Sequence, residues 1–497
     1  MRKFASPIST ISFGRLDAWI IAAVIVGTLL RIIQLDTATL WFDETLTASW
    51  VTLPWNDMLA VVLTDNHLPL YFVLIKAWTG IFGDSALALR SFSVPFSVAT
   101  ILIIAATAKI LSDRATASWA AWLAALSPYL LQHGQEARMY ALLGFLAALN
   151  ILLMARFVSG KSKHLEAGFL AVNTALLATH YYAIFLIAVE LPILFLLERN
   201  RLRAWLPALV ASCVLFIMLV LAAKYLATPH AGGAYHGLKI IGLPGMVWGL
   251  LAGYTLMPSS SEMHDQGLRA ILPYLPIASM ALVALVLTLW RGLQTLSRPA
   301  WILLLGVLAG VLFPPLLMSN LFDIGINPRY AMTGAPAFII LVAAGLAHSV
   351  HQSIGKACAI GLLGLTTYAS YLHLEDPGHG RENIAAAQAW LDQNVPNKET
   401  ILITSSEFTV LTNFFWPHRR FIHYPVSSIV ITQENINAIA NAIPFAENGR
   451  VIFMIGREWI SDPDDLLIPA LEKRYGNCGG ASLRGVRILC LTPRPTN

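Results

Sequence analysis

The sequence predicts a polytopic, mainly α-helical membrane protein that ends in a small α/β domain. Of its 497 residues, 57% are hydrophobic and only 12% are Asp, Glu, Lys or Arg, whereas roughly a quarter of a soluble domain is charged. The mean hydropathy is +0.65. The charge is also uneven, because 24 of the 61 charged residues fall in the last 123. These observations exclude a soluble enzyme, a disordered chain and a fibrous chain.

About eleven apolar stretches predict membrane-spanning helices, since a helix needs roughly 20 apolar residues to cross a bilayer. Their cores lie at 18–35, 89–111, 115–131, 140–157, 167–180, 183–197, 205–226, 270–290, 301–318, 331–348 and 357–372. Two further apolar stretches, 68–82 and 237–257, are interrupted by lysine, proline or glycine. We expect these two to be interfacial or re-entrant helices within two long outer segments, 36–88 and 227–269.

The distribution of Lys and Arg predicts the orientation. With the N-terminus placed in the cytoplasm, 14 of these residues before position 375 fall on the cytoplasmic side and eight on the other. Cytoplasmic loops are enriched in basic residues. We therefore expect a membrane part, 1–374, and an extracytoplasmic domain, 375–497, in a plasma or bacterial inner membrane. The first apolar segment is expected to be an uncleaved anchor.

The terminal domain has the pattern of a small α/β layer. The predicted elements are a helix at 383–394, a strand at 400–404, a helix at 407–416 and strands at 450–455 and 486–491. It contains no phosphate loop and no G-x-G-x-x-G motif, and no basic stripe indicates a nucleic-acid partner. Cys478 and Cys490 could form a disulfide in an oxidising compartment. Sequence alone leaves this pairing open, because it depends on geometry.

The outer side of the predicted membrane part begins with two adjacent carboxylates, Asp43 and Glu44. A carboxylate at the mouth of an apolar cavity suits a general base, provided that it is ionised near neutral pH. The alternative is a helix N-terminus, in which Asp43 is the cap and Glu44 favours the positive end of the dipole. We take both residues as catalytic candidates.

Three basic residues near the outer rim are candidates for binding a phosphate: Lys76, Arg138 and Arg329. Arginine can form two parallel hydrogen bonds to a phosphate, and lysine acts as a point charge. Each also has a structural alternative. Lys76 could extend its ammonium to the interface, Arg138 could form an ion pair with Glu136, and Arg329 could contact lipid headgroups.

Several other polar and aromatic residues gather on the same side and are candidates for contacting the substrate. They are His67, Glu136, Tyr140, His180, Tyr181 and Tyr330. The alternatives are a surface turn at His67 and an interfacial aromatic belt at His180 and Tyr181. The sequence has no H-E-x-x-H and no paired C-x-x-C, so no metal site is assigned.

Taken together, this outer face suits a lipid-linked phosphosugar. The lipid would lie in the bilayer, the phosphate would meet the cations, and preplaced positive charge would stabilise the departing phosphate. A transporter of lipid-linked sugars is the main alternative, but that function predicts internal repeats and charges deep in several spans. An inactive scaffold with a glycan-binding outer domain is a third possibility.

Five blocks of the sequence resemble the family 39 type glycosyltransferases, which include the protein O-mannosyltransferases and the bacterial aminoarabinose transferases. The blocks are Leu-Trp-Phe-Asp-Glu at 40–44, His-Leu-Pro-Leu-Tyr at 67–71, Phe-Gly-Asp-Ser at 82–85 with Ala-Leu-Arg at 88–90, Gln-Glu-Ala-Arg-Met-Tyr at 135–140 and Asn-Pro-Arg-Tyr at 327–330. The second block departs from the family's Pro-Pro-Leu-Tyr. The resemblance covers about residues 18–350.

The resemblance implies a GT-C fold, an extracytoplasmic active site, a polyprenyl-phosphate sugar donor and inversion at the sugar carbon. Carried over, Asp43 would be the base that activates the acceptor, and Glu44 would support the site. Lys76, Arg138 and Arg329 would be candidates for binding the donor phosphate. We expect no cofactor, although the family leaves a divalent metal open. The acceptor would be a glycolipid, a glycan or a protein, and the sequence specifies neither it nor the sugar, the carrier length or the oligomeric state.

Overall fold

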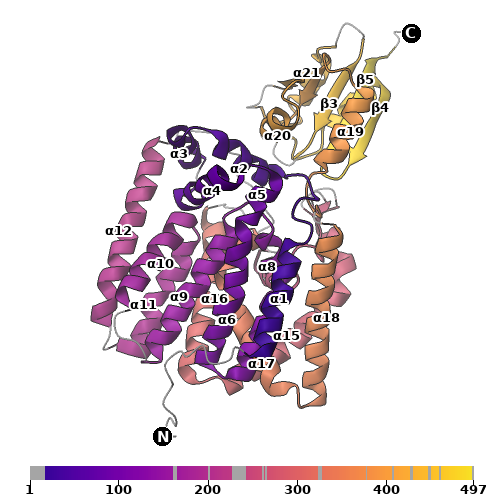
Figure 1. Cartoon of the computed structure of the whole chain (residues 1–497). Helices are drawn as coiled ribbons and strands as arrows, with labels where there is room; N and C mark the ends of the chain where they lie inside the picture. Colours follow the sequence, from indigo (N-terminus) through magenta and orange to yellow (C-terminus); the bar gives the residue numbers. More distant parts are fainter. Residues whose placement is uncertain are drawn as a thin grey trace.

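A computed structural model describes residues 17–65, 67–160, 165–199, 202–226, 242–259, 262–263, 266–322, 327–376, 378–405, 408–425, 429–445, 449–457 and 461–494. These residues form a large bundle of helices and a smaller domain built on a β-sheet at one end of the bundle (Figure 1). The predicted architecture, a mainly α-helical membrane protein with a C-terminal α/β domain, is confirmed.

The bundle contains long apolar helices and shorter ones. In chain order they are α1 (Ala18–Ile32), α2 (Phe42–Thr52), α3 (Trp55–Thr64), α4 (Pro69–Phe82), α5 (Ala86–Ser91), α6 (Ser93–Leu111), α7 (Arg114–Leu126), α8 (Pro128–Gly134), α9 (Tyr140–Val158), α10 (Glu166–Thr179), α11 (Ala183–Glu198), α12 (Leu202–Leu226), α13 (Gly242–Ala252), η3 (Gly267–Tyr274), α15 (Leu275–Thr295), α16 (Arg298–Phe322), η4 (Pro328–Gly334), α17 (Ala335–Ser349) and α18 (Ser353–Glu375). Among the described residues, seven helices are long and apolar enough to cross a membrane. Other predicted spans coincide with shorter helices, so the expected number of eleven is not confirmed.

One predicted span is broken in the structure. The apolar stretch 115–131 is divided into α7 and α8 at Ser127. Pro128 lacks a backbone N–H and occupies the first turn of α8, a position where proline is well tolerated. The Ser127 hydroxyl accepts a hydrogen bond from the Leu130 amide at 3.2 Å and caps the new helix. Hydropathy cannot distinguish such a break from a continuous apolar helix.

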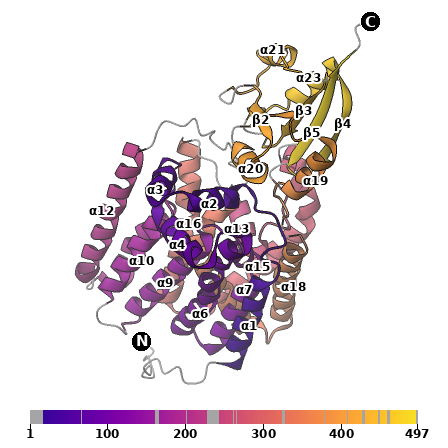
Figure 2. The same cartoon turned by 45° about the horizontal axis from the view of Figure 1, so that its top comes forward.

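The first outer segment, 36–88, forms a layer of helices across the end of the bundle that carries the C-terminal domain. Helices α2, α3 and α4 lie there in both views (Figures 1 and 2). The predicted interfacial helix at 68–82 is α4. In the second outer segment, α13 lies within the predicted helix at 237–257, and residues 227–241 lie outside the described residues. So does the N-terminus with Arg2, Lys3 and Arg15, and the orientation across the membrane stays a prediction.

The C-terminal domain has a five-stranded sheet with the order β2-β1-β3-β5-β4. Strands β1 to β3 are parallel, and β5 and β4 continue the sheet antiparallel. The elements are α19 (Ile384–Asn394), β1 (Thr400–Ile403), α20 (Phe408–Phe415), β2 (Arg420–His423), α21 (Ile436–Asn441), β3 (Val451–Ile455), α23 (Leu467–Arg474), β4 (Tyr475–Leu483) and β5 (Val486–Pro493). Cys478 and Cys490 form a disulfide between β4 and β5.

The C-terminal domain is docked on the bundle through α2. The side chain of Phe42 belongs to the same hydrophobic cluster as Ile384 of α19 and Phe408 of α20. The guanidinium of Arg457, just after β3, lies 3.8 Å from the centre of the Phe42 ring, a distance typical of a cation–π contact. The start of α2 is therefore held between the two parts of the molecule.

Candidate active site at the outer end of the bundle

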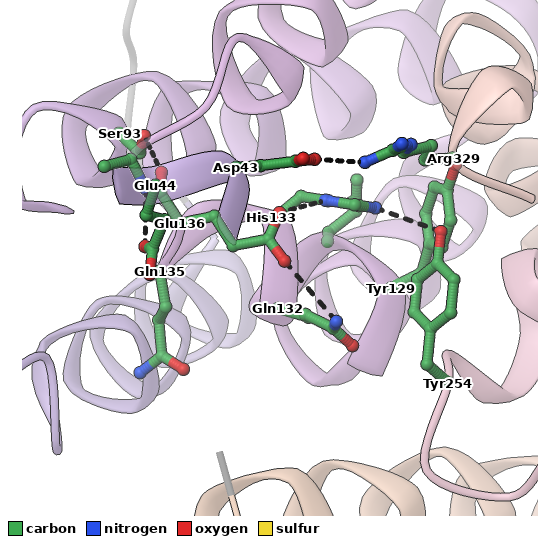
Figure 3. A network of polar contacts seen from close by, with 12 residues as sticks. Asp43, Glu44, Ser93, Tyr129, Gln132, His133, Gln135, Glu136, Tyr254 and Arg329 are labelled. Atoms are coloured by element: carbon green, nitrogen blue, oxygen red, sulfur yellow. Dashed lines mark hydrogen bonds and ion pairs between the residues drawn. The ribbon is translucent and has the colours of Figure 1, made fainter. Parts of the chain in front are cut away.

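Asp43 lies in the first turn of α2, and its side chain is 11% exposed. Its Oδ2 accepts a hydrogen bond from Nη1 of Arg329 at 2.6 Å (Figure 3). Burial alone would raise the pKa of Asp43, but the guanidinium charges of Arg329, Arg138 and Arg457 outweigh it and hold that pKa well below its usual range. Asp43 is therefore ionised at neutral pH.

Arg138 is a second cation beside Asp43. One of its Nη atoms donates to the backbone oxygen of Asp43 at 3.1 Å, and the other donates to Nε2 of His67 at 2.8 Å. Within the described part of the chain, no carboxylate lies within ion-pair distance of its guanidinium. The immediate surroundings of Asp43 therefore carry more positive than negative charge, which favours an anionic ligand.

Arg138 and Arg329 each have one N–H group without an acceptor among the described residues. The Nε atoms of Arg138 and Arg329 are buried, and neither has an acceptor among the residues that the structure describes. An unsatisfied buried N–H is costly. A phosphate oxygen would satisfy it with a charge-assisted hydrogen bond. The cation pair Arg138 and Arg329 thus has the chemistry of a phosphate site.

Arg329 is held in place by its neighbours along the chain. Asn327 caps η4 by accepting a hydrogen bond from the Arg329 amide at 3.1 Å. The hydroxyl of Tyr129 donates to the backbone oxygen of Pro328 at 2.9 Å and ties η4 to α8. The guanidinium of Arg329 lies 5.6 Å from the centre of the Tyr140 ring.

Glu44 is adjacent to Asp43 in sequence but has a different environment. Its carboxylate is fully buried and accepts two hydrogen bonds from Arg90, at 2.8 and 2.6 Å, and one from the Ala137 amide at 2.9 Å. Arg90 also donates to backbone oxygens of the segment that leads into α2. Glu44 therefore fixes the start of α2. This agrees with a supporting role and leaves no free carboxylate oxygen for catalysis.

Lys76, like Glu44, holds α2 in place through its hydrogen bonds. Its ammonium donates to the backbone oxygens of Val51 and Leu53, at the C-terminal end of α2, and lies 5.2 Å from the centre of the Trp55 ring. A cation at this end of a helix satisfies carbonyl groups that have no partner within the helix. The contacts of Lys76 thus assign it to holding α2, and none links it to the phosphate-binding chemistry of Arg138 and Arg329.

Glu136 is the centre of a second polar network. Its Oε2 lies 2.8 Å from Nδ1 of His133, and its Oε1 pairs with Arg381 of the C-terminal domain. Nε2 of His133 lies 3.4 Å from the hydroxyl of Tyr254 (Figure 3). Burial would raise the pKa of Glu136, but the charges of His133 and Arg381 lower it to about 2. The ion pair of Glu136 with Arg138, which the sequence left as an alternative, does not form.

Residues 66–226 match the model of a family described as dolichyl-phosphate-mannose-protein mannosyltransferase. No curated protein matches the chain by sequence. Among solved structures, ArnT from Cupriavidus metallidurans in the apo state is similar, with 12% identity, a TM-score of 0.56 and coverage of 95% of this chain and 98% of that one. ArnT bound to undecaprenyl phosphate has a TM-score of 0.50, with the same identity and coverage.

The oligosaccharyltransferase of Archaeoglobus fulgidus tethered with an acceptor peptide is also similar. It shares 13% identity with this chain and a TM-score of 0.55, with coverage of 97% of this chain and 74% of the other. The structural likeness shows the fold that this chain shares with these proteins. The family model matches residues 66–226, about a third of the chain.

The aromatic candidates form one wall beside Arg329. The rings of Tyr330 and Tyr182 are stacked with centres 4.0 Å apart, and His180 lies 5.9 Å from Tyr330 and 5.7 Å from Tyr140. Burial, with the charges of His67, Arg329 and Arg138, lowers the pKa of His180 to about 3. His180 is therefore neutral at pH 7 and contributes a polar ring to this wall, without a charge.

Two predicted substrate residues occupy the edges of the site. His67 accepts from Arg138 at Nε2, and its Nδ1 lies 2.8 Å from the backbone oxygen of Asp65. Because a guanidinium can only donate, Nε2 of His67 is the acceptor in this contact, and His67 orients Arg138. Tyr181 faces Phe216 of α12, with ring centres 6.2 Å apart, so its ring contact lies outside the aromatic wall.

The described residues contain no group of three or more His, Cys, Asp or Glu side chains placed to hold a metal ion. The expectation that the protein needs no cofactor stays a prediction. The site residues that the sequence reasoning missed are Tyr129, Tyr254, Arg381 and Arg457. The two arginines come from the C-terminal domain and approach Glu136 and Asp43 only after folding. The sole signal for Arg381 was its place at the beginning of that domain.

Proposed function

We propose that this protein is a membrane glycosyltransferase that moves a sugar from a polyprenyl-phosphate donor to a glycolipid, glycan or protein acceptor outside the cytoplasm, with Asp43 as the general base. The observation that carries this proposal is the ion pair of Asp43 with Arg329, beside the surplus cation Arg138. The pair puts a carboxylate, the group that accepts a proton, next to donors that bind a phosphate.

The donor class is supported by the chemistry of the two arginines. Each has a buried Nε–H that an anion would satisfy, and neither needs a nucleotide-binding loop. In the comparisons, ArnT binds undecaprenyl phosphate, and the archaeal oligosaccharyltransferase AglB is found with a dolichol-phosphate. A lipid phosphate at Arg138 and Arg329 would place the sugar near Asp43.

The resting contact explains how Asp43 could become a base only when the donor is bound. While Arg329 is paired with Asp43, the pKa of this carboxylate is too low for efficient proton transfer at neutral pH. A phosphate that engages Arg329 and Arg138 would neutralise part of their charge and raise the proton affinity of Asp43. Donor binding therefore activates the base.

The transfer step then follows. The acceptor hydroxyl or amine gives its proton to Asp43, and the acceptor atom forms a bond to the anomeric carbon of the sugar. The bond between that carbon and the phosphate oxygen breaks with inversion, and Arg138 and Arg329 stabilise the negative charge on the released lipid phosphate. A transporter of lipid-linked sugars would not require this base.

The deciding experiment is Asp43→Asn in the full chain reconstituted into vesicles, with polyprenyl-phosphate mannose as the donor probe and release of polyprenyl phosphate as the readout. We expect the rate to fall by about 10²–10⁴-fold, the usual contribution of a general base, while the protein stays folded and inserted. The matched control is Asp57→Asn, because Asp57 is an exposed acid in the first turn of α3. Turnover by Asp43→Asn at the wild-type rate would reject the mechanism.

A further inference from the structure

A cavity of about 280 Å³ lies at the end of the bundle that is opposite the C-terminal domain. It is formed where α15 and α17 end and α18 begins, at the lower end of the bundle in Figure 1. The other end of α18, at Glu375, leads into the C-terminal domain. The cavity is therefore separate from the candidate active site around Asp43, which lies beside that domain.

The cavity lies in a basic part of the chain. All of its lining belongs to residues 281–300 and 341–360, which contain three basic residues and no Asp or Glu. The exposed Arg291 is one of the lining residues. Its guanidinium donates to two neutral amide oxygens, those of Gln352 at 3.0 Å and Gln294 at 3.5 Å, and forms no ion pair with a described residue. A guanidinium has five N–H donors, so Arg291 can also bind an anion.

The first turn of α18 forms part of the wall, with Ile354 and Gly355. The amides of a first turn have no acceptor within their own helix, and Gln352 at the N-cap makes no side-chain hydrogen bond to them. The aligned peptide dipoles of this 23-residue helix add partial positive charge at the same place. Helix N-termini bind phosphate for these two reasons.

A buried hydroxyl provides independent evidence for a ligand. Thr288 lines the cavity and is 2% exposed, and its Oγ1 has no hydrogen-bond partner among the described residues. Its methyl carbon lies against Gly345 of α17, so the hydroxyl is the branch of the side chain that remains for a ligand. A buried hydroxyl without a partner costs free energy. An oxygen of a phosphate or a glycerol would satisfy it.

The rim of the cavity is apolar. Leu287, Trp290 and Ile354 are all exposed at its edge. On a bundle that spans a membrane, such side chains contact lipid, and tryptophan is enriched at the level of the headgroups. A free phosphate ion would have no use for this rim, whereas a phospholipid would lay its acyl chains on it.

We infer that this cavity binds the headgroup of an anionic phospholipid. The phosphate would accept hydrogen bonds from Arg291 and from the first turn of α18, and the Thr288 hydroxyl would contact another headgroup oxygen. The acyl chains would extend along the apolar rim. Because both lining segments are basic and contain no acid, a lipid with a net negative charge is favoured over a zwitterionic one. The inference does not depend on the reaction proposed for Asp43.

Native mass spectrometry of the full chain in detergent micelles tests the inference, with dioleoyl phosphatidylglycerol as the anionic probe and dioleoyl phosphatidylcholine as the zwitterionic one. We expect the wild type to bind phosphatidylglycerol more tightly. Arg291→Gln should weaken this binding roughly 5-fold or more, and the protein should stay folded because Arg291 is exposed. Thr288→Val should weaken it roughly 2- to 10-fold, the effect of one lost neutral hydrogen bond. The thermal stability of Thr288→Val without lipid should be unchanged or higher, because an unsatisfied hydroxyl is removed.

The matched control is Arg298→Gln, which removes the same charge at the same end of the bundle. Arg298 is exposed at the start of α16 and does not line the cavity, so this variant should bind phosphatidylglycerol as the wild type does. Equal binding of the two lipids by the wild type, or equal weakening by Arg291→Gln and Arg298→Gln, would overturn the inference. Unchanged binding by both Arg291→Gln and Thr288→Val would also overturn it. Displacement of phosphatidylglycerol by inorganic phosphate at a similar concentration would do so too, because it would show a site for free phosphate.

Discussion

Asp43 and Glu44 are adjacent acids at the start of α2, and their partners give them different roles. Asp43 is paired with one arginine at the edge of a site that is partly open, where Arg329 is 24% exposed. Glu44 has three hydrogen bonds and no exposure. Water can solvate Arg329 if Asp43 is changed, but Arg90 is too deeply buried for that.

We therefore expect Glu44→Gln to destabilise the protein and Asp43→Asn to do so much less. Removing one partner of a buried ion pair costs about 3–5 kcal/mol, so Glu44→Gln should lower the free energy of unfolding by an amount in that range. Equilibrium unfolding in mixed micelles measures it. Stability of Glu44→Gln equal to that of Asp43→Asn would contradict the assignment of Glu44 as a clamp.

The sequence predicted which types of residue form the candidate site, but it predicted their hydrogen-bond partners less well. The outer clusters contain Asp43, Arg138 and Arg329, and the structure brings these three together. It separates Lys76, whose ammonium is used at the end of α2. A lysine beside a membrane can serve a phosphate or a helix end equally well. Only the position of the nearest unpaired carbonyl groups decides between them.

Among the helices, α9, α10 and α11 share a polar contact inside the bundle. Asn150 donates to Asn173 at 2.7 Å and to Glu190 at 2.6 Å, and Asn173 donates to Glu190 at 3.0 Å. All three side chains are fully buried. In an apolar interior a carboxyl group is costly unless it has hydrogen bonds. The three residues therefore fix the relative positions of these helices.

We expect Asn150→Ala to loosen this group, because it leaves one oxygen of Glu190 and Oδ1 of Asn173 without their donor. Interhelical hydrogen bonds in membranes contribute about 0.6 kcal/mol on average and up to about 1.7 kcal/mol, so the loss from two bonds should be about 1–3 kcal/mol. Thermal unfolding of the full chain measures it. The control is Asn320→Ala, because the exposed amide of Asn320 donates to Leu316 of its own helix. Equal melting temperatures for both variants would argue against an inter-helix role.

Some helices and strands could be predicted from the sequence, and others could not. Long apolar stretches gave the spanning helices, and α19, β1 and β3 follow the alternation of apolar residues in the terminal domain. The strand β4 was missed because its sequence, Tyr475–Leu483, contains three glycines and few apolar residues. It forms because it pairs with β5 and is bonded to it through the disulfide of Cys478. These are contacts between strands, which the local strand propensity of a sequence does not predict.

At the scale of the whole molecule, the contact of Arg381 with Glu136 joins the C-terminal domain to the bundle. Their side chains are 11% and 3% exposed, and the guanidinium of Arg381 also lies 4.8 Å from the centre of the Trp41 ring. The site thus has a wall that is contributed by a separate part of the chain. Arg381 and Glu136 are 245 positions apart. A single sequence could not predict this pair, because the residues around Glu136 carry no information about a partner so distant in the chain.

We expect Arg381→Ala to weaken the docking of the domain by about 3–5 kcal/mol, the cost of breaking a buried pair. Hydrogen exchange of α2 should accelerate, because Phe42 would lose part of its cover. The control is Arg114→Ala, since Arg114 is 67% exposed and its pair with Asp17 is of the kind that contributes about 0–1 kcal/mol. Unchanged exchange in α2 of Arg381→Ala would show that the ion pair does not hold the domain.

The same ion pair gives the docking a dependence on pH. The pKa of Glu136 is lowered from its ordinary 4.5 to about 2, so its contribution to stability is complete above pH 4.5 and is lost as the pH falls toward 2. Asp43, whose pKa is also lowered, contributes in the same direction. Glu136→Gln should be less stable at neutral pH, and its stability should change less on acidification than that of the wild type.

The position of Phe42 has a consequence for biosynthesis. A side chain from the beginning of the sequence completes the interior of a domain whose last strand ends at Pro493. While the ribosome is still inserting the later helices, α2 can already pack against α3 and α4, but Arg381 and Arg457 have not yet been made. We therefore expect the surroundings of Asp43 to be completed only after translation has passed the final strand.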